Sequence, residues 1–71
     1  MKITVKPRFN ASKQQLERYS ETMYLAYLPF AEDSSAAGVI AVLLSRTMGI
    51  PPHKIEFVAV DSRKDWIFET V

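Results

Sequence analysis

Four short stretches of this chain alternate hydrophobic and polar residues, which is the pattern of half-buried β-strands. The first is "MKITVKP", in which Ile3 and Val5 share one face and Pro7 ends the strand. The others are "TMYLAYLPF", "KIEFVAV" and "WIFETV". The polar segment "RFNASKQQLERYSE" predicts a loop, which can include a short strand or a helical turn near Gln15–Tyr19. The pattern does not decide between these alternatives. The pattern therefore predicts four strands, and "TMYLAYLPF", apolar on both faces, is typical of an interior one.

The stretch "DSSAAGVIAVLLSRTMGIPP" predicts the only long helix of the chain. Asp33 or Ser34 can cap its amino terminus, because a side-chain oxygen there accepts from free backbone amides. Gly49 suits the carboxyl-terminal cap, and the two prolines that follow prevent continuation. The element order is thus β-β-α-β-β in one domain, residues 1–71. We expect an α+β fold, a two-layer sandwich in which an antiparallel four-stranded sheet carries one main helix on one face.

The two sides of this helix differ little in polarity, because no charge falls between Ser34 and Ser45. At 100° per residue, six positions form the side predicted to face the sheet. They are Ala36, Val39, Ile40, Leu43, Leu44 and Thr47. The opposite side carries Ala37, Gly38, Ala41, Val42, Ser45 and Met48.

Small residues on that outer side would let another backbone approach closely, so we predict a protein interface there. It comprises Gly38, Ala41, Val42 and Ser45, and its simplest partner is a second copy of the chain in a twofold homodimer. Another protein partner fits as well. An ordinary alanine-rich exposed face that needs no partner is the alternative.

The composition narrows the classes of protein that fit. Apolar residues make up 48% and charged residues 24%, as in globular domains. There is no cysteine and a single histidine, His53, so we expect no disulfide, no metal site and no cofactor. A core of this size contributes on the order of 3–5 kcal/mol to the free energy of unfolding. Because disulfides and metals are not expected, self-association is the remaining way to add stability. The longest apolar run is far shorter than the roughly 20 residues that span a bilayer, and no signal-peptide pattern is present. We therefore expect a cytoplasmic protein with no membrane partner.

Charge is distributed unevenly along the chain, although the net charge is only +1. Residues 1–18 hold five basic groups and one acidic group, which gives +4, and residues 19–71 hold four basic and seven acidic groups, which gives −3. A basic amino-terminal quarter is compatible with nucleic acid. A total near zero argues against strong phosphate binding, so nucleic acid is possible but not favoured.

The order of the motifs resembles a known family. A strand ending in "VKP" is followed by a strand with a proline-containing loop and by an alanine-rich helix after Asp33. "MGIPPHKIEFV" then leads to an "SRK" hairpin. Over about Ile3 to Thr70 this arrangement resembles the YggU-like family of small uncharacterised proteins. The resemblance implies a two-layer fold with an antiparallel sheet of strand order 1-2-4-3. It implies no activity, because none is established for the family as a whole.

Two motifs depart from the family's pattern. Its helix usually opens with Gly-Lys-Ala-Asn, where this chain has Ser-Ser-Ala-Ala from Ser34. Val60 stands where a glycine is usual before the hairpin, and Asp65 where a lysine is usual after it. If the replaced groups carry the family's function, this member has lost or altered it.

The strand order implied by the resemblance brings several polar groups to one end of the sheet. The helix amino terminus, the turn at Asp61–Asp65 and the start of the first strand would meet there. Five residues then form a candidate site for an anionic ligand or RNA: Lys2, Ser34, Ser35, Arg63 and Lys64. The alternative is that Asp33 and Ser34 merely cap the helix while the two hairpin cations are solvated.

A second basic group lies near the amino terminus. Lys6, Arg8 and Lys13, with Phe9 and Tyr19, form a candidate aromatic RNA surface. Solvated lysines around a core phenylalanine are the alternative.

Catalysis has little support in the sequence. His53 follows two prolines and has no cysteine partner, and there is no glycine-rich phosphate loop. We therefore predict a non-enzymatic binding or assembly domain that associates with protein through the outer helix face. Binding of an anionic ligand or RNA is the alternative function.

Overall fold

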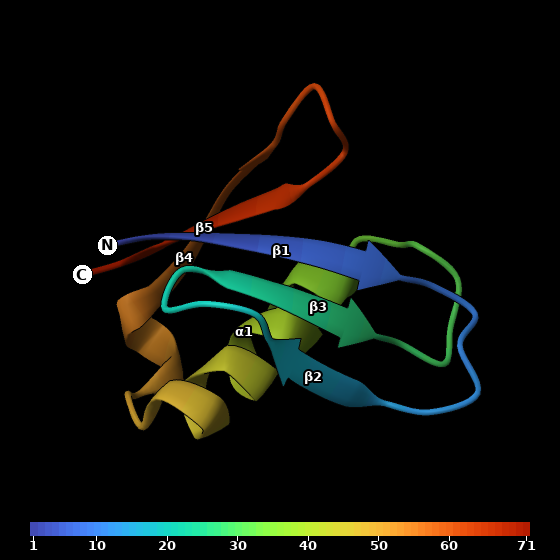
Figure 1. Cartoon of the computed structure of the whole chain (residues 1–71), viewed down its shortest axis with the longest axis horizontal. Coiled ribbons are helices and arrows are strands. Elements are labelled where there is room, and N and C mark those ends of the chain that lie inside the picture. The colour runs from blue at the N-terminus through green and yellow to red at the C-terminus, as the bar shows by residue number, and fades with distance from the viewer.

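A five-stranded sheet with one helix against one face makes up the chain, and the computed structural model describes all of residues 1–71 (Figure 1). The elements follow in the order β1 (Lys2–Arg8), β2 (Gln15–Arg18), β3 (Met23–Tyr27), α1 (Ala36–Met48), the 3-10 turn η1 (Pro52–Lys54), β4 (Ile55–Val60) and β5 (Trp66–Thr70). The predicted α+β class is confirmed. The single α-helix is neither long nor apolar enough to cross a membrane.

The predicted sheet is wrong in strand number, order and direction. The strands lie in the order β2-β3-β1-β5-β4, and β1 pairs with β3 in parallel. The cause is the polar segment at Gln15–Arg18, which forms a short strand of its own. Because β2 pairs antiparallel with β3, the chain reverses direction twice between β1 and β3. The two longer strands therefore run the same way, and the sheet is mixed rather than antiparallel.

The core lies between the sheet and the helix. Its members alternate along the strands, as the hydrophobic pattern predicts. They are Ile3, Val5, Tyr24, Ala26, Leu28, Ala36, Ile40, Leu44, Ile55, Trp66 and Phe68. Leu25 is also buried, but it is not part of this cluster. It alternates with Tyr24 and Ala26, which places it on the sheet face opposite the helix.

The buried side of α1 is rotated from the predicted one. Ala36, Ile40 and Leu44 are buried as expected, but Thr47 is exposed. Ser45, predicted on the outer side, is only 7% exposed. Its hydroxyl donates to the Val42 carbonyl at 2.8 Å, so a serine is accommodated there without an unpaired polar atom.

Three more residues of the predicted outer side, Ala37, Ala41 and Met48, pack partly against the core. Because every position from Ala36 to Ser45 is apolar or small, the sequence holds no polar boundary that fixes the centre of the buried stripe. The helix therefore turns more of its apolar surface toward its own sheet than its sequence pattern indicates.

The predicted carboxyl-terminal cap of the helix is confirmed. Gly49 adopts a left-handed conformation with φ 72°, and its N–H donates to the Ser45 carbonyl at 2.9 Å. The Ile50 N–H donates to the same carbonyl at 3.1 Å. The chain can then turn into η1 and β4.

Two helix substitutions should separate the buried side from the exposed one. We expect Ile40→Ala to lower the free energy of unfolding by about 2–5 kcal/mol, because Ile40 is completely buried and its truncation leaves a cavity. Val42→Ala is the matched control on the same helix. Its side chain is 38% exposed, so the change should stay within about 0.5 kcal/mol. Urea denaturation followed by circular dichroism measures both, and equal losses would contradict the observed orientation of the helix.

Candidate functional site

The carboxyl end of β1 and the β4–β5 hairpin meet at one end of the sheet. The antiparallel register of β1 and β5 places Val5 opposite Trp66. The turn at Asp61–Asp65 therefore lies beside the last residues of β1. Because β1 and β3 are parallel, the end of β3 and the loop toward the helix lie at this end too (Figure 1).

A polar groove of about 230 Å³ lies between the end of β1 and the hairpin. Its lining consists of Lys6, Pro7, Arg8, Arg63, Lys64 and Asp65. Four cations against one carboxylate leave a net charge of +3 in the groove. The sequence contains these cations in two separate segments, and the β1–β5 pairing brings them together.

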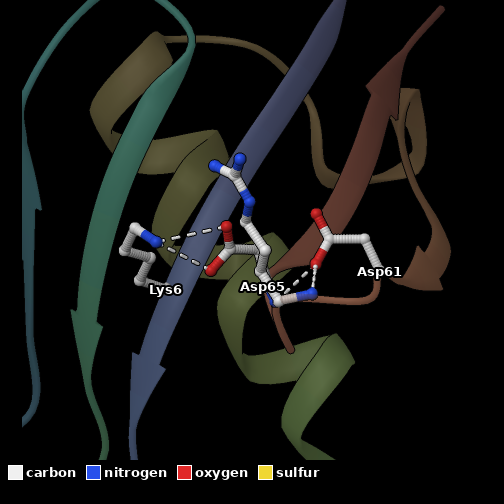
Figure 2. Close-up of polar contacts among 4 residues, drawn as sticks. Lys6, Asp61 and Asp65 are labelled. Atoms are coloured by element: carbon white, nitrogen blue, oxygen red, sulfur yellow. Dashed lines mark hydrogen bonds and ion pairs between the residues drawn. The ribbon is translucent and has the colours of Figure 1, made fainter.

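One ion pair ties the hairpin to β1. The Lys6 ammonium donates to both carboxylate oxygens of Asp65, at 3.0 and 3.2 Å (Figure 2). The Asp65 side chain is 9% exposed and that of Lys6 42%. Solvent therefore screens the pair from one side, and its net contribution to stability is modest. Its main effect is positional, because it occupies Lys6 and fixes the hairpin over the end of β1.

The hairpin turn is held by a second aspartate. The Asp61 carboxylate accepts from the backbone N–H groups of Arg63 and Asp65, each at 2.9 Å. The Lys64 N–H donates to the Asp61 carbonyl at 3.0 Å. Lys64 itself has φ 64°, a left-handed conformation that costs a residue with a β-carbon roughly 1 kcal/mol. The predicted turn is thus confirmed, and it presents Arg63 and Lys64 on a defined backbone.

A fifth cation extends the positive surface toward the end of β3. The Lys13 ammonium lies 4.8 Å from the centre of the Tyr27 ring, and Tyr27 is the register partner of Arg8. We call the resulting surface the basic band: Lys6, Arg8, Lys13, Arg63 and Lys64. It crosses β3, β1 and β5, which is two strand spacings or roughly 10 Å. Lys6 is the only one of the five in an ion pair.

An aromatic hollow of about 440 Å³ adjoins the groove and shares Pro7 and Lys64 with it. Its other lining residues are Phe9, Glu32, Val60 and Trp66. The centre of the Phe9 ring lies 5.8 Å from the centre of the Trp66 ring and 6.4 Å from that of the Phe30 ring. Phe9 therefore serves the core and lines this hollow at the same time.

The predicted anion site is assembled only in part. Arg63 and Lys64 lie at the expected end, but Lys2 lies at the other end of β1, opposite Glu69. The placement of Lys2 was wrong because β1 runs parallel to β3 rather than antiparallel. Lys6 and Arg8, which the sequence assigns to a different surface, take its place. Tyr19 follows β2 near Met23 and is likewise remote from the basic band.

The helix amino terminus already carries a carboxylate. Asp33 Oδ1 accepts from the Ser35 hydroxyl at 2.6 Å and from the Ser35 N–H at 2.8 Å. The hydrogen bond from the Ser35 hydroxyl has the largest effect and the one from the Ser35 N–H the next largest. Both hold the pKa of Asp33 below its usual value of 3.8. An external anion would meet this negative charge. Ser34 is exposed and Ser35 is used by Asp33, so neither contributes to the basic band.

The predicted interface on the outer helix face is narrower than expected. Gly38 is exposed with open space around it, and Val42 is the one large apolar side chain of α1 among the exposed ones. Ala41 packs partly on the core, and Ser45 is buried. His53 lies exposed in η1.

Comparison with protein-family models, with curated proteins and with solved structures finds no match to this chain. The YggU-like resemblance therefore stays a prediction. The sheet that it implies differs from the observed one in strand order.

The Asp33–Ser35 contact has a measurable consequence for pH. We expect Ser35→Ala to raise the pKa of Asp33 toward 3.8, because the largest stabilising hydrogen bond is removed. Ser34→Ala is the control, since Ser34 makes no side-chain bond to Asp33. A lowered pKa in the folded state stabilises the fold above pH 4, and this contribution is lost as the pH falls through the folded pKa. NMR titration of the Asp33 carboxyl carbon measures the shift, and an unchanged value in Ser35→Ala would refute the assignment.

Proposed function

We propose that this chain is a small non-enzymatic domain that binds an extended anionic ligand, with single-stranded RNA as the favoured class, along the basic band. The observation that carries the proposal is the convergence of cations from three separate segments on one end of the sheet. Four of the five, Arg8, Lys13, Arg63 and Lys64, are exposed and in no ion pair. Unpaired cations on a common surface form an electrostatic footprint for phosphate groups.

The shape of the surface favours a chain of phosphates over a single one. The cations lie side by side across three strands, and the groove between them is open and lined by no hydrophobic residue. A compact phosphate site needs donors that converge on one point, such as the amides of a helix amino terminus. Here that terminus is occupied by Asp33.

The aromatic hollow supports the same ligand class. Single-stranded RNA presents unstacked bases beside its phosphates, and proteins commonly bind them on aromatic or apolar surfaces. Phe9 is half-buried and Trp66 is 6% exposed, so the hollow offers ring edges rather than an open stacking platform. We therefore expect weak base selectivity.

The strained turn residue fits a functional role for the hairpin. Glycine would adopt the left-handed conformation of Lys64 at lower cost. A lysine at this position adds a charge to the groove, which offers a functional reason for a lysine rather than a glycine there.

Binding should be moderate and sensitive to salt, because the whole chain carries only +1. About four phosphate contacts on a single strand give a slope near −3 in log K against log salt. The outer helix face offers mainly Val42 for association, so this face supports the assembly function less well than the basic band supports binding. Membership of the YggU-like family and a cytoplasmic location remain part of the proposal.

Charge reversal tests the basic band directly. We expect Arg63→Glu to weaken binding of a fluorescent single-stranded RNA about tenfold or more at 50 mM salt, because it replaces attraction by repulsion at the groove. Arg8→Glu should act in the same way. Arg63→Gln should reduce the salt slope by about 0.7, the contribution of one phosphate contact on a single strand. Fluorescence anisotropy measures the affinities and the slopes.

Lys2→Glu is the matched control, because it makes the same charge change at the opposite end of β1. It should weaken RNA binding much less than Arg63→Glu, since a substitution at Lys2 changes the net charge of the chain but no contact in the groove. An equal loss of affinity in both variants would show that binding depends on net charge and not on the basic band. Absence of RNA binding at 50 mM salt would refute the proposed function.

A further inference from the structure

The two edges of the sheet are built differently. The β2 edge is four residues long and polar, with Gln15 and Arg18 exposed at its ends. The β4 edge is six residues long, and every residue after Ile55 is exposed. An edge strand leaves a row of backbone N–H and C=O groups free to pair with another strand. Short length and charge protect the first edge. The second edge is longer, and its central residues, Phe57 and Val58, are uncharged.

All the exposed side chains of β4 except that of Glu56 are apolar. Phe57 is 44% exposed, Val58 57% and Val60 45%, which makes this the densest run of exposed large hydrophobic residues in the chain. The charges of this segment are Lys54 before the strand, Glu56 near its start and Asp61 after it, and the four residues from Phe57 to Val60 carry none. Lys54 is in no ion pair, and only one oxygen of Asp61 is engaged by the hairpin turn.

A bulge in β4 sets which residues share a face. Ile55, Phe57 and Val60 pair with Thr70, Phe68 and Trp66, three residues that alternate along β5. All three therefore face the helix side. Glu56 and Ala59 pair with Glu69 and Ile67 and face the other side. Val58 is the extra residue between the two sets. In a regular strand without a bulge, Ile55 and Val60 would point to opposite faces, because they are five positions apart.

We propose that β4 pairs antiparallel with β4 of a second copy of this chain, about a twofold axis at Phe57–Val58. In this register Ile55 lies opposite Val60 of the second copy and Glu56 lies opposite Ala59. The bulge puts the two members of each pair on the same side of the sheet, as direct cross-strand partners must be: Ile55 and Val60 on the helix side, Glu56 and Ala59 on the other. Lys54 then lies opposite Asp61 of the second copy, and the symmetry repeats this ion pair at the other end.

The choice of a second copy as the occupant rests on this self-complementarity. The segment from Lys54 to Asp61 carries a cation at one end, an anion at the other and apolar residues at the centre, and its one internal charge, Glu56, lies opposite the uncharged Ala59 in this register. An antiparallel copy matches each of these features, whereas a parallel strand would place like charges opposite each other. An unrelated strand would need a complementary sequence that nothing in the chain specifies.

The proposed dimer also explains the bulge. Bulges on edge strands usually hinder pairing with other chains. In this strand the bulge corrects the facing of the residues that flank it, so that a twofold pairing becomes consistent. The result would be a ten-stranded sheet with both helices on one face and with the Phe57 side chains next to the axis. Apolar surface and backbone groups that lie open on one copy would both be covered.

Sedimentation equilibrium on the intact chain tests the association. We expect a mass of about twice 8.1 kDa at high protein concentration, persisting when the salt is raised, because apolar contacts and backbone pairing dominate. Val58→Lys should shift the chain to the monomeric mass, since it places a charge next to the twofold axis. Val42→Lys is the matched control on the outer helix face and should leave the dimer intact.

A cysteine pair tests the register, and the natural chain contains no cysteine to interfere. We expect an equimolar mixture of Glu56→Cys and Ala59→Cys chains to form a disulfide-linked dimer under mild oxidation. Both positions are exposed, so the substitutions should be tolerated. The Glu56→Cys chain alone should cross-link at least tenfold less, because its two cysteines would lie three residues out of register.

A monomer at every concentration, or a dimer that Val42→Lys dissociates and Val58→Lys does not, would overturn the proposal. Cross-linking of Glu56→Cys alone as efficient as that of the mixture would overturn the register. Charge reversal at Arg63 tests the basic band separately, and it should not alter the mass.

Discussion

The parallel pairing of β1 with β3 is the constraint on which the rest of the structure depends. Five register pairs join the two strands, from Thr4 with Met23 to Arg8 with Tyr27. The contact continues beyond the strands, because the Leu28 N–H donates to the Arg8 carbonyl and the Ala11 N–H to the Leu28 carbonyl. This direction of β1 brings Lys6 and Arg8 to the hairpin end of the sheet and leaves Lys2 at the other. An antiparallel β1 would have reversed that placement and dispersed the basic band.

The sequence pattern predicts the four longer strands, because alternation of buried and exposed side chains is a property of each strand alone. It leaves β2 undecided between a loop, a short strand and a helical turn, because this segment has a single apolar residue, Leu16, and pairs with β3 through its backbone. Strand direction follows from the presence or absence of such connecting strands, so one missed strand inverted the expected pairing of β1. Arg63 and Lys64 were placed correctly because the direction of β5 relative to the helix did not depend on β2. Lys2 was placed wrongly because the direction of β1 did.

The helix shows the limit of periodicity in a different way. Its length and its Gly49 cap were predictable from local chemistry, but its rotation was not. A helical stripe is located by the boundary between apolar and polar residues, and here both sides from Ala36 to Ser45 are apolar or small. Packing against the sheet decides the rotation, and the Val42 carbonyl satisfies the hydroxyl of Ser45 within the helix. The absence of charge from Ser34 to Ser45 is thus explained largely by coverage from the chain's own sheet, with Gly38 and Val42 left outside.

The hairpin between β4 and β5 links the two proposed surfaces. Asp61 follows the β4 edge and fixes the turn through one carboxylate oxygen, while its other oxygen accepts no hydrogen bond within the chain. Asp65 at the other end of the turn pairs with Lys6 and fixes the hairpin to β1. Between them Arg63 and Lys64 line the groove, which no residue of β4 lines. In an antiparallel dimer the two hairpins, and with them the two basic bands, lie at opposite ends of the joined sheet. The proposed pairing would therefore leave both basic bands open, because none of their residues belongs to β4, and Val60 is the one residue that the aromatic hollow shares with the paired edge.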